Sequence, residues 1–115
     1  DDPKSNYYNQ IVKNDKVELK DWESSEKMWK ADPWYRFGVV IDVNNSPISK
    51  MKGSCLFLHN WDGPDDSTVG CTAMAPEFMK EIIFWLEIEK QPILVQLTAE
   101  LYNKYMDELG LPSLK

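Results

Sequence analysis

The sequence predicts a single α+β domain over residues 1–115, mainly β with packed helices. Short runs rich in β-branched or large apolar residues predict strands over 36–44, 54–60 and 91–98. Two runs with apolar residues at helical spacing, beginning at Pro76 and at Ala99, predict amphipathic helices. With 115 residues, 43% of them hydrophobic, the chain can bury one modest core.

The N-terminal third is predicted to be mostly loop. In "NYYNQIVK", residues 6–13, we expect at most a helical turn that docks on the core. The segment "WESSEKMWKAD", residues 22–32, predicts a short surface helix capped by Ser24 or Ser25 and ended before Pro33.

Two neighbouring strands follow. "RFGVVIDVN", residues 36–44, is bounded by a turn signal, and "SCLFLHN", residues 54–60, is joined to it through a loose hairpin. Strand alternation in the second run predicts that Cys55, Phe57 and His59 share one face.

The second half alternates helix, strand and helix. Pro76 suits the first position of a helix of about three turns, whose apolar stripe is predicted to pack in the core. That stripe consists of Phe78, Ile82, Trp85 and Leu86. After the strand over 91–98, Thr98 is predicted to cap the helix "AELYNKYMDEL", which Gly110 closes. Because three strands leave exposed edges, we expect further strands upstream of Asp1.

Charge and hydropathy exclude several classes of partner. Thirteen Lys and Arg against 19 Asp and Glu give a net charge of −6, which argues against nucleic acid or an anionic membrane surface. No apolar run approaches the roughly 20 residues of a membrane helix. The first residues lack both an initiator Met and the pattern of a signal peptide, so we expect a piece of a longer precursor.

The only histidine and one of the two cysteines lie close together in "SCLFLHNWDGPDDSTVGCTAM", residues 54–74. A thiol becomes a nucleophile when an imidazole takes its proton and backbone N–H groups hold the oxyanion. His59 ends a predicted strand and Cys71 follows Gly70, so the two are a candidate base and nucleophile. Thr68 and Ser67 are candidates to orient the site, and Asn60 or a backbone carbonyl to hold the imidazole tautomer.

Plainer interpretations of this stretch stay open. His59 and Cys71 also suit a half-buried histidine and a small apolar residue, and Cys55 is a candidate buried thiol or disulfide partner of Cys71. A zinc site is a further alternative, with three ligands and no obvious fourth: Cys55, His59 and Cys71.

Trp61 suits a substrate groove or plain packing. The acidic side chains of the loop suit a solvated turn or a cation-binding lip: Asp62, Asp65 and Asp66.

The segments "GSCLFLH" and "STVGCTAM" resemble the L,D-transpeptidase catalytic domain family, which has the YkuD-like fold. In that family a histidine at a strand end precedes a "[S/T]-x-G-C" element, whose cysteine is acylated. Many members carry "S-H-G-C-[IV]-R", where this chain has Val69 and Ala73 in place of the His and the Arg. The resemblance covers roughly residues 1–98 and implies the C-terminal part of a β-sandwich catalytic domain whose N-terminal strands lie outside this chain.

The resemblance implies an acyltransferase of bacterial cell-wall biogenesis, periplasmic or secreted, that acts on peptidoglycan stem peptides without a cofactor or metal. Cys71 would form a thioester and pass it to an amine to make a crosslink, with His59 as general base. An L,D-carboxypeptidase with the same pair and a non-catalytic cell-wall binding module are the alternatives. The implied catalytic residues are Cys71, His59, Thr68 and Gly70. The candidate substrate-binding residues are Trp61, Asn60 and Thr72.

Overall fold

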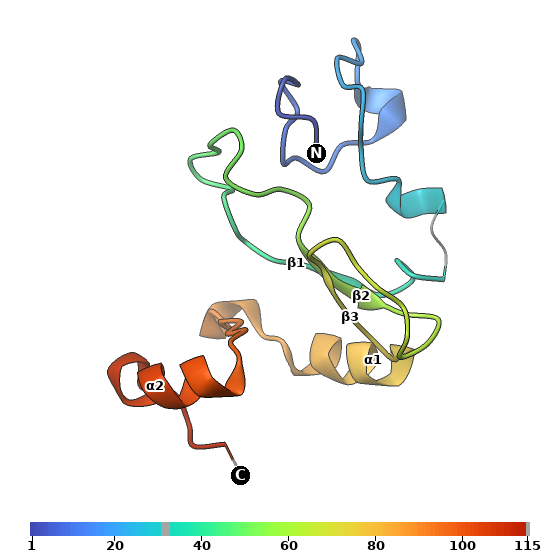
Figure 1. Cartoon of the computed structure of the whole chain (residues 1–115). Coiled ribbons are helices and arrows are strands. Elements are labelled where there is room, and N and C mark those ends of the chain that lie inside the picture. Colours follow the sequence, from blue (N-terminus) through green and yellow to red (C-terminus); the bar gives the residue numbers. More distant parts are fainter. Residues whose placement is uncertain (31–32, 115) are drawn as a thin grey trace.

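A three-stranded sheet holds the fold together in the computed structural model, which describes residues 1–30 and 33–114 (Figure 1). The strands are β1 (Gly38–Val40), β2 (Phe57–Asn60) and β3 (Thr72–Met74), in the order β1-β2-β3. β1 runs antiparallel to the central strand β2, and β3 runs parallel to it. With the two α-helices of the described chain, this makes a small α+β fold.

Two of the three predicted strands are confirmed, and one is wrong. β1 and β2 lie within the predicted ranges 36–44 and 54–60. Residues 91–98 form no strand in the described chain, and their apolar side chains are mostly exposed, with Ile93 at 87%. The third strand is instead β3, directly after the loop that follows β2.

The register of the sheet places the candidate site. His59 is paired with Ala73 across the parallel β2 and β3, and Leu58 with Thr72. Since paired residues share a face, Cys71, two residues before Ala73, continues the face of His59. Cys55 precedes β2 with a φ of 56°, so the alternation predicted for it does not apply.

Helix α1 (Pro76–Trp85) covers one side of the sheet and packs against β2. Pro76 occupies the first turn as predicted. Glu77 lies beside it, where the positive end of the helix dipole stabilises a carboxylate. The predicted core stripe is wrong at Phe78 and Trp85, which are 55% and 73% exposed, because the helix buries Met79 instead, at 0%. A single helix on a small sheet has only one narrow contact face.

Helix α2 (Ala99–Leu109) projects from the rest of the molecule (Figure 1). Its predicted caps are confirmed. The Thr98 hydroxyl accepts a hydrogen bond from the Leu101 amide at 3.3 Å, and Gly110 closes the helix in the left-handed region at φ 63°. A 3-10 turn, η3 (Ile88–Lys90), lies between the two helices. Neither helix of the described chain has the length and apolar character that crossing a bilayer requires.

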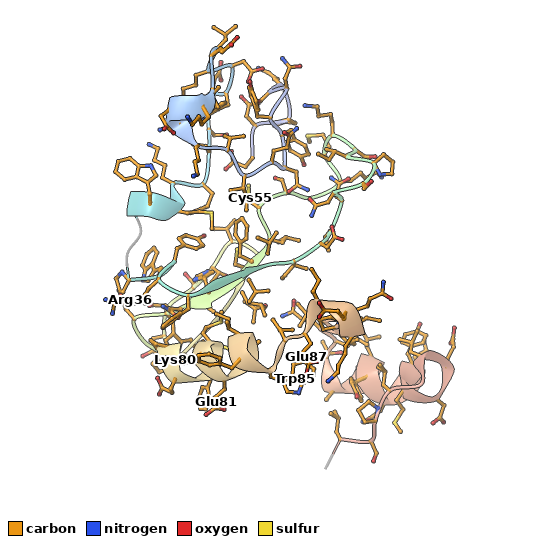
Figure 2. All side chains as sticks on the ribbon, turned by 180° about the vertical axis from the view of Figure 1, so that it is seen from behind. Arg36, Cys55, Lys80, Glu81, Trp85 and Glu87 are labelled. Atoms are coloured by element: carbon orange, nitrogen blue, oxygen red, sulfur yellow. The ribbon has the colours of Figure 1, made fainter. Side chains whose placement is uncertain are left out.

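The N-terminal segment lies on the side of the sheet opposite α1 in both views (Figures 1 and 2). It is mostly loop, as predicted, with 3-10 turns η1 (Asn14–Lys16) and η2 (Met28–Lys30). In place of the helix predicted over 22–32 only η2 forms, and residues 31–32 lie outside the described residues. The Ser24 hydroxyl donates to the Asp1 carboxylate at 2.5 Å instead of capping a helix.

Carboxylate and amide side chains hold this loop segment together. The Asp21 carboxylate accepts from the Ser5 hydroxyl at 2.5 Å and from the Asn6 amide at 2.9 Å, and these bonds lower its pKa. Asn9 ties the segment to the sheet, since its Oδ1 accepts from the Cys55 amide at 3.0 Å. The N-terminal loop therefore helps to position the residue that begins the approach to β2.

Candidate active site

His59 is held rigidly in the central strand. It is 7% exposed, and its Nδ1 lies 2.6 Å from the Asn60 carbonyl oxygen. Because a carbonyl oxygen only accepts hydrogen bonds, this contact requires the proton on Nδ1 and leaves Nε2 as the basic atom of the neutral ring. The backbone carbonyl thus selects a tautomer suited to a general base.

Cys71 is half-buried between Gly70 and β3. Its thiol donates to the Cys55 carbonyl oxygen at 3.3 Å. Burial raises the pKa of the thiol, while the Phe57 amide, which donates to the sulfur, opposes the rise. The thiol therefore stays protonated in the free protein and needs a base to become a nucleophile.

One cavity of about 320 Å³ joins the candidate base and nucleophile. Both His59 and Cys71 line it, together with Cys55 and Ala73. Its remaining walls come from segments far apart in the sequence, which the sheet brings together: Asp1, Glu26, Trp34, Tyr35, Ser54, Asn60, Trp61, Asp66, Ser67, Thr68 and Val69. The fold thus gives the thiol and the imidazole a shared space of the size of a small ligand.

Thr68 and Gly70 shape the backbone that carries Cys71. The Thr68 hydroxyl donates to the Cys71 carbonyl oxygen at 2.5 Å, which fixes the turn before β3. Gly70 has a φ of 126°, a conformation that strains any residue with a side chain. A Cβ at this position would also lie 3.4 Å from the Leu56 side chain. Gly70 is thus required by the turn, although it does not itself line the cavity.

The three predicted substrate-binding residues fall in different places. Trp61 and Asn60 line the cavity, and the Trp61 amide donates to the Met74 carbonyl at 3.0 Å. Thr72 does not line it, since its side chain lies on the other face of β3, where its hydroxyl accepts from the Gln96 side chain. Thr72 was predicted to bind substrate because it follows Cys71 in the sequence. The prediction is wrong because adjacent residues of a strand point to opposite faces of the sheet.

Tyr35 and Glu26 also belong to the site, and the sequence offered no signal for either. The Tyr35 ring centroid lies 5.0 Å from that of His59 and 5.9 Å from that of Phe57. Burial raises the pKa of Tyr35, with further contributions from the Glu26 carboxylate and from Cys71. The Tyr35 hydroxyl in turn lowers the pKa of Cys71, so Tyr35 couples the acidic wall of the cavity to the sulfur.

The structure bears on the disulfide, the zinc site and the cation-binding lip that the sequence left open. Cys55 and Cys71 are both free thiols, although they line the same cavity. Among the described residues, no group of three or more His, Cys, Asp and Glu is arranged to hold a metal ion. Asp66 forms a turn, because its carboxylate accepts from the Asp62 amide at 2.7 Å and the Gly63 amide at 3.2 Å. Arg36, the only arginine of the chain, does not line the cavity, and Figure 2 shows it at the edge of the molecule, away from Cys55.

Comparison of the chain with protein-family models, with curated proteins and with solved structures finds no match. The function therefore has to be argued from the site itself.

Proposed function

We propose that this chain is part of an L,D-transpeptidase-type acyltransferase that forms crosslinks between peptidoglycan stem peptides through a thioester on Cys71. The observation that carries the proposal is the shared cavity of His59 and Cys71, with His59 Nδ1 bound to the Asn60 carbonyl. The segments "GSCLFLH" and "STVGCTAM" support the substrate class through their resemblance to that family. The enzyme would work outside the cytoplasm, in the periplasm or at the cell wall.

The first half of the reaction acylates the enzyme. As the thiol proton leaves the Cys55 carbonyl and moves to His59 Nε2, the sulfur attacks the carbonyl carbon of a stem-peptide amide. The C–N bond then breaks, and the imidazolium returns the proton to the leaving amine, which departs with a terminal D-amino acid. Thr68 holds the Cys71 backbone in place, and Gly70 allows the turn before it. In this proposal backbone amides of that turn would donate to the developing oxyanion.

The second half regenerates the thiol. An acceptor amine attacks the thioester carbonyl and loses a proton to His59 Nε2, the C–S bond breaks, and the thiolate takes the proton back. If water takes the place of the amine, the same residues make a carboxypeptidase. Product analysis with and without an acceptor amine separates these two reactions.

The decisive experiment is intact-mass analysis after incubation with a carbapenem or a tetrapeptide stem. We expect one acyl adduct in the native protein and in Cys55→Ser, which alters the other thiol of the same cavity, and none in Cys71→Ser. His59→Gln should slow acylation by roughly 10²–10⁴-fold, as expected for a lost general base. A folded protein that forms no adduct, or forms it on Cys55, would overturn the proposal and leave a binding module.

A further inference from the structure

Two free thiols share the Cys71 cavity. Cys55 and Cys71 are the only cysteines of the chain, and both line the cavity wall. The Cys71 sulfur donates to the Cys55 carbonyl oxygen at 3.3 Å, and that oxygen is two covalent bonds from the Cα that carries the second thiol group. Acyl transfer as proposed above uses only the thiol of Cys71, so the thiol of Cys55 has no part in it.

The two sulfurs lie in one electrostatic neighbourhood. Burial is the largest cause that raises the pKa of the Cys71 thiol, and Cys55 is a further one. Burial also raises the pKa of Tyr35 most, and both Cys71 and Cys55 add to that rise. The two thiols therefore influence each other and the same aromatic neighbour across the cavity.

Cys55 can also be reached from a second side. A larger cavity of about 750 Å³, lined mainly by the N-terminal segment, shares Cys55 and Glu26 with the Cys71 cavity. Figure 2 shows Cys55 between the N-terminal segment and the sheet. Both thiols are half-buried, so a small reagent in solution has a route to each of them.

Neither cysteine belongs to a strand of the sheet. Cys55 precedes β2, which begins at Phe57, and Cys71 precedes β3, which begins at Thr72. Cys55 has a φ of 56°, so its backbone is already irregular. A disulfide requires the two Cα atoms to lie about 4.4–6.8 Å apart. Side-chain rotation and a local adjustment at Cys55 can serve this requirement without breaking a strand pairing.

We propose that Cys55 is a resolving thiol: with a low-molecular-weight disulfide as the oxidant, Cys55 and Cys71 close a reversible disulfide that withdraws the nucleophile until it is reduced. This deepens the proposed function, on which it rests only for the consequence that acyl transfer stops. The compartment proposed above, outside the cytoplasm, is one in which disulfides form and persist.

The reaction takes two steps of thiol–disulfide exchange. After its proton passes to a base, the Cys71 sulfur attacks one sulfur of the small disulfide, whose S–S bond breaks and whose other half leaves as a thiolate and is protonated. The Cys55 sulfur, after losing its own proton, then attacks the Cys71 sulfur of this mixed disulfide and releases the second small thiol. The two cysteines are oxidised by two electrons, and the small disulfide is reduced to two thiols.

Equilibration with reduced and oxidised 2-mercaptoethanol tests this on the native protein. The mixture is quenched with acid, and the intact mass is measured at each ratio of the two reagents. We expect a monomer lighter by two hydrogens with no bound mercaptoethanol, and dithiothreitol should restore both thiols. The effective concentration of the thiol pair, obtained from the equilibrium ratio, should exceed about 0.1 M, above the mM range of flexibly joined groups.

Variants assign the bridge to the cavity. Cys55→Ser and Cys71→Ser should each end as a mixed disulfide with one mercaptoethanol. The matched control combines Cys55→Ser with Met51→Cys, which keeps two thiols but places the second at a position that is 77% exposed and does not line the cavity. Its effective concentration should be at least about ten-fold lower than that of the native pair.

Native protein that ends with mercaptoethanol on both cysteines or as a disulfide-linked dimer would overturn the inference, and so would a control that bridges as readily as the native chain. The first two outcomes are measured without any variant, so they do not depend on whether a variant folds. None of these masses depends on acyl transfer. A failure here therefore leaves the carbapenem test of the reduced protein intact, and a missing acyl adduct leaves the disulfide intact.

Discussion

Met79 is the side chain through which α1 holds the central strand, and its removal should destabilise the whole fold. It is 0% exposed, and the other buried apolar side chains of the described chain are only Tyr8, Phe57 and Leu58. Met79→Ala deletes three heavy atoms, which is about 2.4 kcal/mol at about 0.8 kcal/mol per buried group. The cavity left behind brings the expected loss to about 3 kcal/mol.

A loss of this size is large for a small domain, whose free energy of unfolding is roughly 5–15 kcal/mol. Urea unfolding followed by tryptophan fluorescence measures it. With a denaturant slope of about 1.5 kcal/mol per M, the midpoint should fall by about 2 M. His59 and Asn60 lie on the strand that α1 supports, so the fraction of protein able to form the carbapenem adduct should fall over the same urea range.

Phe78→Ala is the matched control, because it truncates a larger side chain one position away on the same helix. Phe78 is 55% exposed, so its loss should cost about 1 kcal/mol or less. Equal losses in the two variants, or a loss below about 1 kcal/mol for Met79→Ala, would refute the packing of α1 on β2 through Met79.

Two further predictions concern the thiol and the C-terminal helix. Because burial and the Glu26 carboxylate raise the pKa of Cys71 while the Tyr35 hydroxyl lowers it, Glu26→Gln should move the pH profile of iodoacetamide alkylation to lower pH and Tyr35→Phe to higher pH. Both variants are measured in Cys55→Ala, where Cys71 is the only thiol. Shifts of the two alkylation profiles in the same direction would contradict the opposite effects of Glu26 and Tyr35 on the pKa of Cys71. Thr98→Ala should speed hydrogen exchange at the Leu101 amide and leave the urea midpoint nearly unchanged, whereas a lower midpoint would mean that α2 supports the core.

The features that the sequence predicted correctly are those set by local chemistry. Pro76 at a helix start, Thr98 as a cap and Gly110 as a left-handed stop act within a few residues of themselves. The β-branched and apolar runs around β1 and β2 likewise limit the chain to extended conformations. The pairing of His59 with Cys71 as candidates came from the same short stretch of sequence.

Only the tertiary structure decided which residues meet. The parallel pairing of β3 with β2 depends on a long-range contact, so three residues after a loop became a strand while 91–98, with stronger strand propensity, found no partner in the described chain. The same pairing turned Thr72 away from the cavity. Tyr35 and Glu26 entered the site because packing, which has no local signature in sequence, brought them beside Cys71.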